Sequence, residues 1–229
     1  FFFSSRRRHT RSLCDWSSDV CSSDLGQQVH GLASAIREPR LWLLSAVYVG
    51  VATGFYGFSF WIPRFVAEAL PMASRSPALV NLISAFPYGL AVLAMLAVGR
   101  SADRHQEYRW HVVGPLAIAA LGLGLAIASQ GVLRLLLISI ATAAAFACLG
   151  PFWAIPPQFL GGSGAAGGIA AINSVGNIGG FLAPIVMGHL MLLPHGDGLA
   201  LAALAGMLVL SALLAMGLKQ AAPARLSSP

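Results

Sequence analysis

Asn173 and Asn177 lie four residues apart in a long apolar stretch of the sequence. In a helix this spacing places both amide side chains on one face. Each amide carries N–H donors and a carbonyl acceptor, so the pair can form hydrogen bonds with a polar ligand. The alternative is that the amides join neighbouring helices, because Gly176 and Gly180 form a G-x-x-x-G pattern typical of closely packed helices. Two amides on one face favour a cavity.

Aromatic residues and prolines mark two further stretches that could line a cavity. Tyr56 and Phe60 are also four residues apart on one predicted helix face; the alternative is that such aromatic residues lie at a lipid interface. Trp153 follows Pro151 and precedes the prolines at 156–157. Because proline removes a backbone donor and clashes with the preceding turn, this segment predicts a broken helix beside Trp153.

No set of residues in the sequence predicts catalysis or metal binding. The serines in the apolar stretches have no acid and base partners at a recognisable spacing, and His189 is the one histidine well inside these stretches. Cys148 is expected to be a small packing residue, and no cysteine–histidine set has the spacing of a metal site. We therefore expect neither an enzyme nor a cofactor.

A charged segment at 99–109 contains Gly99, Asp103, Arg104 and Arg109. The carboxylate of Asp103 can pair with a basic residue or with the positive N-terminus of a neighbouring helix. A contact of this kind holds one end of a helix bundle shut in one conformation and breaks in another. The alternative is a solvated charged turn.

The composition places these residues in a membrane protein. Charged residues make up 10% and hydrophobic residues 57% of the 229 residues, whereas soluble proteins have about 25% charged residues. The mean hydropathy is +0.74. The net charge of +6 does not indicate nucleic-acid binding, because the basic residues cluster between apolar runs instead of forming a dense stripe.

Six segments are long enough to cross a bilayer, whose apolar core of about 30 Å needs about 20 helical residues. Backbone groups in lipid need internal hydrogen bonds, and the runs neither alternate nor are short enough for a barrel. The predicted fold is therefore an all-α integral membrane protein. Its six expected transmembrane helices are 41–63, 77–99, 110–133, 135–159, 165–192 and 199–218.

The other segments are expected to lie outside this bundle at 41–218. Residues 1–25 hold seven of the 22 charged residues, and 15–25 match what one reading frame of a widely used sequencing adapter encodes. We therefore interpret 1–25 as an artefact, the alternative being a disordered tail. Residues 26–40 are expected to form a cytoplasmic loop segment and 219–229 a cytoplasmic tail.

The distribution of lysine and arginine predicts the orientation in the membrane. Basic residues accumulate on the cytoplasmic side of membrane proteins. With the N-terminus inside, three basic residues would lie outside, namely Arg64, Arg75 and Arg134. Both termini are therefore predicted to be cytoplasmic, because the inside would hold seven: Arg37, Arg40, Arg100, Arg104, Arg109, Lys219 and Arg225.

The segment at 99–109 resembles the G-x-x-x-D-R-x-G-R-R-type loop of the major facilitator superfamily. Gln106 replaces the motif glycine and Tyr108 an arginine. The segments 39–63, 99–111 and 150–188 resemble the C-terminal half, helices 7 to 12, of the anion:cation symporter family within that superfamily. The resemblance covers about residues 36–218.

This resemblance implies one half of a twelve-helix fold, built from two inverted three-helix repeats, in a bacterial cytoplasmic membrane. It implies symport of small organic anions, such as sugar acids or other carboxylates, by alternating access with a coupling ion, expected to be a proton. The expected partners are the lipid bilayer and a missing N-terminal six-helix half, with no nucleic acid.

The resemblance also implies roles for particular residues. Substrate contacts are expected for Asn173 and Trp153, and more weakly for Tyr56, Phe60 and Asn177. The loop at 99–109 would act as a cytoplasmic gate. The alternative hypothesis is a six-helix scaffold or membrane-embedded enzyme unrelated to transport.

Overall fold

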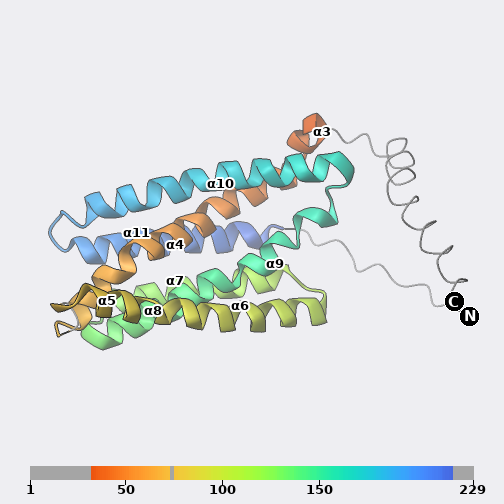
Figure 1. Ribbon diagram of the computed structural model, residues 1–229. Helices are drawn as coiled ribbons and strands as arrows, with labels where there is room; N and C mark the ends of the chain where they lie inside the picture. The colour runs from red at the N-terminus through yellow and green to blue at the C-terminus, as the bar shows by residue number, and fades with distance from the viewer. Residues whose placement is uncertain (1–31, 73–74, 219–229) are drawn as a thin grey trace, which may run out of the picture.

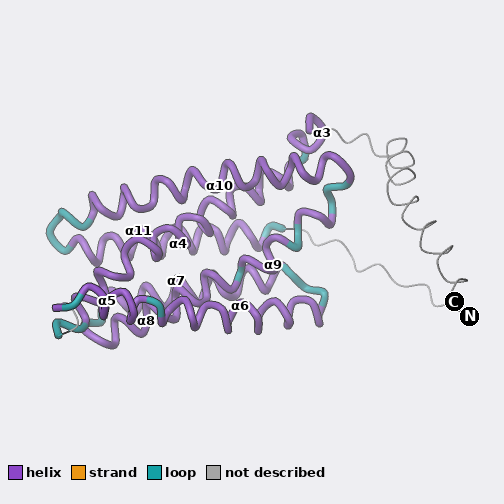
Figure 2. The backbone as a smooth tube through the Cα atoms, viewed as in Figure 1, coloured by secondary structure: helices purple, strands orange, loops and turns teal. Residues whose placement is uncertain are grey.

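The computed structural model of the chain describes residues 32–72 and 75–218, in which every regular element is a helix (Figures 1 and 2). Six helical segments are long and apolar enough to cross a membrane, which confirms the predicted fold class. Residues 1–25 and 219–229 lie outside the described residues. A short helix, α3 (Leu32–Arg37), precedes the six segments, which are α4 (Pro39–Ala69), α5–α6 (Pro77–Ser84 and Phe86–His105), α7 (Arg109–Ile127), α8–α9 (Gly131–Ala147 and Leu149–Trp153), α10 (Gly162–Leu190) and α11 (Gly196–Met216).

Prolines interrupt two of the six segments. The second is divided at Ala85 into α5 and α6, just before Pro87, which has no backbone N–H to continue the preceding turn. In the fourth segment, α8 is followed by the single turn α9 and by a short 3-10 helix, η3 (Pro156–Gln158). The broken helix predicted beside Trp153 is therefore present.

Several helix boundaries differ from the predicted ones. α4 continues through Pro63 to Ala69, and α6 continues past Gly99 to His105. The helix expected at 110–133 ends at Ile127, because a polar turn follows and Gly131 has a left-handed φ of 57°. The helix expected to begin at residue 199 begins earlier, at Gly196. For α7 the prediction extended the helix to the next charged residue, Arg134, and for α11 it began the helix three residues too late, because a short turn with one left-handed residue carries little signal in an apolar sequence.

The six segments form two sets of three, α4 to α7 and α8 to α11, and most of the packing is between helices of different sets. The second helix of each set packs on the first helix of the other: α10 on α4, and α6 on α8. The third helices follow the same rule, with α11 on α4 and α7 on α8, and they also pack against each other. This packing is the arrangement expected for two repeats related by an approximate two-fold axis.

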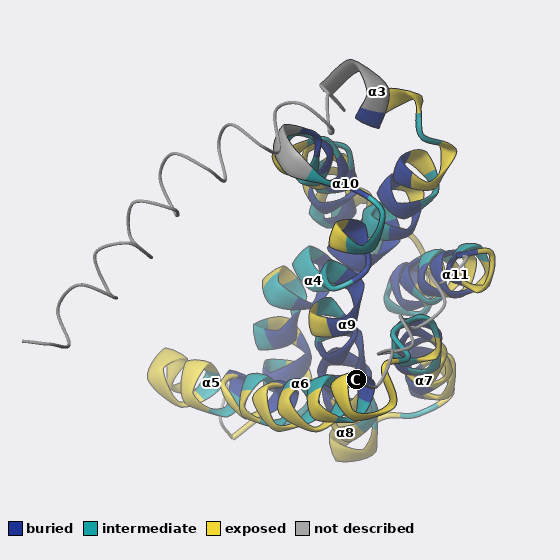
Figure 3. Cartoon of the chain, turned by 90° about the vertical axis from the view of Figure 1, so that its right-hand side faces the viewer, coloured by how far each residue is buried: buried dark blue, intermediate teal, exposed yellow. Residues whose placement is uncertain are grey.

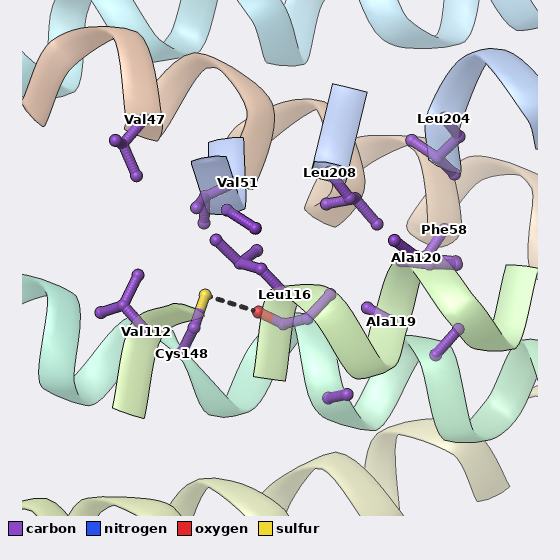
Figure 4. Close-up of a cluster of buried hydrophobic side chains, with 14 of the residues drawn as sticks. Val47, Val51, Phe58, Val112, Leu116, Ala119, Ala120, Cys148, Leu204 and Leu208 are labelled. Carbon is purple, nitrogen blue, oxygen red and sulfur yellow. Dashed lines mark hydrogen bonds between the residues drawn. The ribbon is translucent and has the colours of Figure 1, made fainter. Parts of the chain in front are cut away.

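A buried apolar cluster joins the two sets at the centre of the bundle (Figure 4). Val51 of α4, Leu116 of α7 and Leu208 of α11 are each at most 2% exposed. Cys148, between α8 and α9, is completely buried in the same cluster, and its Sγ donates to the carbonyl of Ala145 at 3.0 Å. Cys148 is thus a packing residue, as predicted.

Burial is uneven among the six segments. In its most apolar stretch α4 is 56% buried, whereas α5–α6 is 17% and α10 28% buried. In the end-on view of Figure 3, α10 and α6 lie on either side of α4 and α9, and α5 and α6 carry many exposed residues. The apolar surfaces of α5–α6 and α10 are therefore left for lipid or for another membrane-embedded partner.

Candidate ligand-binding site

A cavity of about 350 Å³ lies between α4, α9 and α10. It brings together four of the five residues that the sequence singles out: Tyr56, Trp153, Asn173 and Asn177. The fifth, Phe60, is 64% exposed and is not among the residues that line the cavity. The remaining lining residues are Tyr48, Val51, Ala52, Phe55 and Leu149.

Tyr48 holds the aromatic wall of the cavity together. Its ring stacks on Phe152, with centroids 5.1 Å apart and planes inclined by 17°. Trp153 meets Tyr48 edge-on at 4.9 Å and 67°. Consecutive residues point about 100° apart around a helix, so in the turn of α9 Phe152 faces the core, where it is fully buried, while Trp153 faces the cavity.

A second aromatic chain leads from the cavity to α6. Phe55 lies 5.1 Å from Tyr56 and 4.7 Å from Phe146 of α8. Phe146 in turn lies 5.8 Å from Tyr88 of α6. The cavity is thereby connected by ring contacts to the first helices of both three-helix sets.

The two asparagines hydrogen-bond to each other along α10. The Nδ2 of Asn177 donates to the main-chain oxygen of Asn173 at 2.9 Å and to its Oδ1 at 3.1 Å. Neither amide bonds to another helix within the described residues, so the Nδ2 of Asn173 and the Oδ1 of Asn177 are left for a ligand. The N and O assignment follows from this bonding pattern.

The glycines of α10 lie beside the asparagines, on the side of the helix that packs against α4. A Cβ on Gly176 would meet the ring of Tyr48, and one on Gly180 the ring of Tyr56. Gly179 lies closest to main chain, since its Cβ would be 2.5 Å from the oxygen of Val49. The glycines therefore bring α10 close to α4, as the G-x-x-x-G pattern indicates, whereas the amides of Asn173 and Asn177 line the cavity and do not join neighbouring helices.

Sequence reasoning missed Tyr48 and Phe55, although a signal was present. Tyr48, Ala52 and Tyr56 are spaced by four residues, so they follow one face of α4. The missing information was that Tyr48 is held by Phe152, which comes from a part of the chain more than a hundred residues away.

No Asp, Glu, Lys or Arg is among the cavity-lining residues. The cavity can orient a polar ligand through amides and phenols, and it can cover the apolar faces of that ligand with aromatic rings. It cannot by itself neutralise the charge of an anion. A charged ligand would need a counter-charge from outside these residues.

The charged segment at 99–109, expected to be a loop, is helical as far as His105, so only residues 106–108 connect α6 to α7. Asp103 is exposed and accepts a hydrogen bond from the Oη of Tyr108 at 3.4 Å. Desolvation, and then the charge of Asp103, raise the pKa of Tyr108, which keeps its hydroxyl protonated as the donor. Gln106 has a left-handed φ of 51°, a conformation that glycine adopts without strain. This explains why a glycine suits the corresponding motif position.

The other loop residues have separate contacts. Arg109 donates from Nη1 to the oxygen of Leu218 at 3.5 Å, beyond the C-terminal end of α11, where a cation is favourable. Arg104 is exposed, and Asp103 forms an ion pair with neither arginine within the described residues. A Cβ on Gly99 would meet nothing within 4 Å, so packing inside the described bundle does not require this glycine.

His111 joins α6 to α7 beside this loop. Its Nε2 lies 2.9 Å from the Oγ of Ser101, and its Nδ1 lies 3.4 Å from an oxygen of Glu107. The same carboxylate oxygen accepts the main-chain N–H of Trp110 at 2.9 Å and so caps the start of α7. These contacts, which the sequence alone did not indicate, fix the angle between the two helices.

The sequence profile of the Major Facilitator Superfamily matches residues 6–184. The chain belongs to this superfamily. Its six membrane-spanning helices make it a multi-pass membrane protein, and its family is one of transporters, which confirms the prediction that it is not an enzyme.

Curated relatives carry transporter names and are about twice as long as the matched region. A tartrate transporter of Agrobacterium vitis is 34% identical over 199 residues, covering 86% of this chain and 45% of the relative. The metabolite transport protein NicT of Pseudomonas putida is 32% identical over 191 residues, covering 82% and 43%. The inner membrane transport protein RhmT of Escherichia coli is 29% identical over 202 residues, covering 88% and 47%. The chain thus spans about half the length of these relatives.

Proposed function

We propose that this chain is the C-terminal half of a secondary transporter for small organic anions, of the anion:cation symporter type. The observation that carries the proposal is the cavity in which Asn173, Asn177, Tyr48 and Trp153 converge. Amides and a phenol suit the hydroxyl and carboxyl oxygens of a sugar acid or similar carboxylate. The names of the Agrobacterium vitis and Escherichia coli relatives support this substrate class and a bacterial inner membrane.

The proposal requires a second six-helix half. The cavity has no cationic residue, and α5–α6 and α10, on either side of α4 and α9, have the least buried surfaces. A partner half that covers these helices would close the cavity and would supply the cation for the carboxylate and the group that carries the coupling proton. Alternating access then arises from rocking of the two halves around the bound anion.

We propose that both ends of the described chain face the cytoplasm, with the 99–109 loop as the gate. Arg37, Arg40 and Arg109 lie at the end of the bundle where α11 also finishes, and Arg64 and Arg134 lie at the other end. The exposed Asp103 is free of ion pairs within the described residues and can therefore pair with the other half in one conformation. Its release would open the cytoplasmic side.

The replacement of Asn173 by alanine tests the substrate site. In the complete transporter that contains this chain, reconstituted in proteoliposomes with an inward proton gradient, we expect N173A to raise the KM for labelled tartrate about 2- to 10-fold, the effect of one lost hydrogen bond. Q130A removes an amide from an exposed position before α8, outside the cavity, and should leave the KM unchanged. If no labelled carboxylate accumulates, or if both variants behave alike, the proposal is wrong.

A further inference from the structure

A second cavity, of about 480 Å³, lies at the opposite end of the bundle from the 99–109 loop. It is formed where α4 ends, α7 ends, α8 begins and α11 begins, and it shares no residue with the cavity between α4, α9 and α10. Its lining residues are Arg64, Ile127, Arg134, Met191, Leu193, His195, Gly196, Asp197 and Gly198.

The charges in this second cavity do not cancel. Arg64 is neutralised, since its Nε lies 2.7 Å from Glu68 and its Nη2 lies 3.0 Å from Asp197. Arg134 has no ion pair within residues 32–72 and 75–218. The Nε of Arg134 is buried without a hydrogen-bond partner there, and its guanidinium lies 6.0 Å from the ring centre of Phe65. A partly buried guanidinium that lacks an acceptor favours an anion.

The start of α11 adds unpaired donors to the same cavity. No side chain caps this helix, and His195 before it has a left-handed φ of 58°. The N–H of Gly196 bonds to Leu193, but within the described residues those of Asp197 and Gly198 have no acceptor. First-turn N–H groups attract anions through their partial positive charge.

We propose that the second cavity binds an oxyanion, a carboxylate or phosphate group, with Arg134 as its main partner. The planar guanidinium can donate two parallel hydrogen bonds to such a group. The N–H groups of Asp197 and Gly198 can donate to the remaining oxygens. The carboxylate of Asp197, which also lines the cavity, is paired with Arg64. The oxyanion comes either from a soluble anion or from a lipid headgroup at the membrane surface.

Binding measurements on the complete transporter test this site in two arms. In the first arm, equilibrium dialysis in lipid-free non-ionic detergent measures saturable binding of labelled inorganic phosphate and labelled tartrate. In the second arm, native mass spectrometry counts retained phosphatidylglycerol against phosphatidylcholine. We expect R134Q to weaken binding at least about tenfold in one arm, because a hydrogen bond to a charged group is lost. R134K keeps the charge and should lose less.

The control is R75Q, which removes a charge from an exposed position at the same end, outside the cavity. Loss of phosphate or tartrate binding in R134Q identifies a soluble anion, and loss of phosphatidylglycerol alone identifies a lipid headgroup. Equal binding by the wild type, R134Q and R75Q in both arms overturns the proposal. Thermal unfolding of each variant shows that it is folded. Because binding and not uptake is measured, this result is separate from that of the N173A test.

Discussion

Replacement of Phe152 by alanine is expected to cost about 3–5 kcal/mol of unfolding free energy, the usual effect of removing a fully buried phenylalanine ring. Phe152 is 0% exposed, and it contacts two of the aromatic residues that line the cavity, Tyr48 and Trp153, at centroid distances of 5.1 Å. The variant should therefore lose substrate affinity as well as stability, because Tyr48 no longer has a surface to stack on.

The measurement is denaturant or thermal unfolding of the complete transporter in detergent, together with tartrate binding. F181A is the matched control, since the ring of Phe181 on α10 is 70% exposed and its removal leaves no internal hole. F152L separates the two effects: leucine fills most of the volume but cannot stack, so affinity should fall more than stability. Similar destabilisation by F152A and F181A would contradict the packing described above.

The six helices could be predicted from the sequence because the thickness of the bilayer sets the length and composition of each span. Each span needs about 20 apolar residues without charge, and the chain offers six such runs. The helix ends were predicted less accurately, because in an apolar segment a helix can end at a residue whose backbone conformation, and not its charge, stops it. Gly131 begins α8 and His195 precedes α11, with φ of 57° and 58°, and neither is a charged residue that would mark a break in an apolar run.

The cavity could be predicted in part, for a related reason. Polar residues are rare in these spans, so Asn173 and Asn177 stand out against an apolar background. Aromatic residues are common both at lipid interfaces and in protein cores, and their spacing in the sequence does not show in which of the two they lie. Phe60 and Tyr48 show this: the periodicity of α4 selected the exposed Phe60, whereas contact with Phe152 brings Tyr48 to the cavity.

Replacement of Gly179 by alanine, where α10 packs against α4, is expected to lower both stability and substrate affinity. The added Cβ would lie 2.5 Å from the main-chain oxygen of Val49 and 2.8 Å from the Oγ1 of Thr53. Main chain cannot rotate away as a side chain can, so α10 must move from α4. Overpacking of this kind costs about 1–3 kcal/mol. The displacement also separates Asn177, two residues earlier on α10, from Tyr48 and Tyr56 on α4.

G124A is the matched control: it is also a glycine-to-alanine change, but it is expected to raise the stability of the protein. Gly124 is an exposed residue in the last turn of α7, and its Cβ would meet nothing within 4 Å. Alanine is a better helix former than glycine, so this variant should gain stability, by at most about 0.5–1 kcal/mol. Unfolding of the two variants, measured side by side with tartrate binding, should therefore shift in opposite directions, with affinity lost in G179A alone. Equal shifts would show that α4 and α10 are not held at the distance that shapes the cavity.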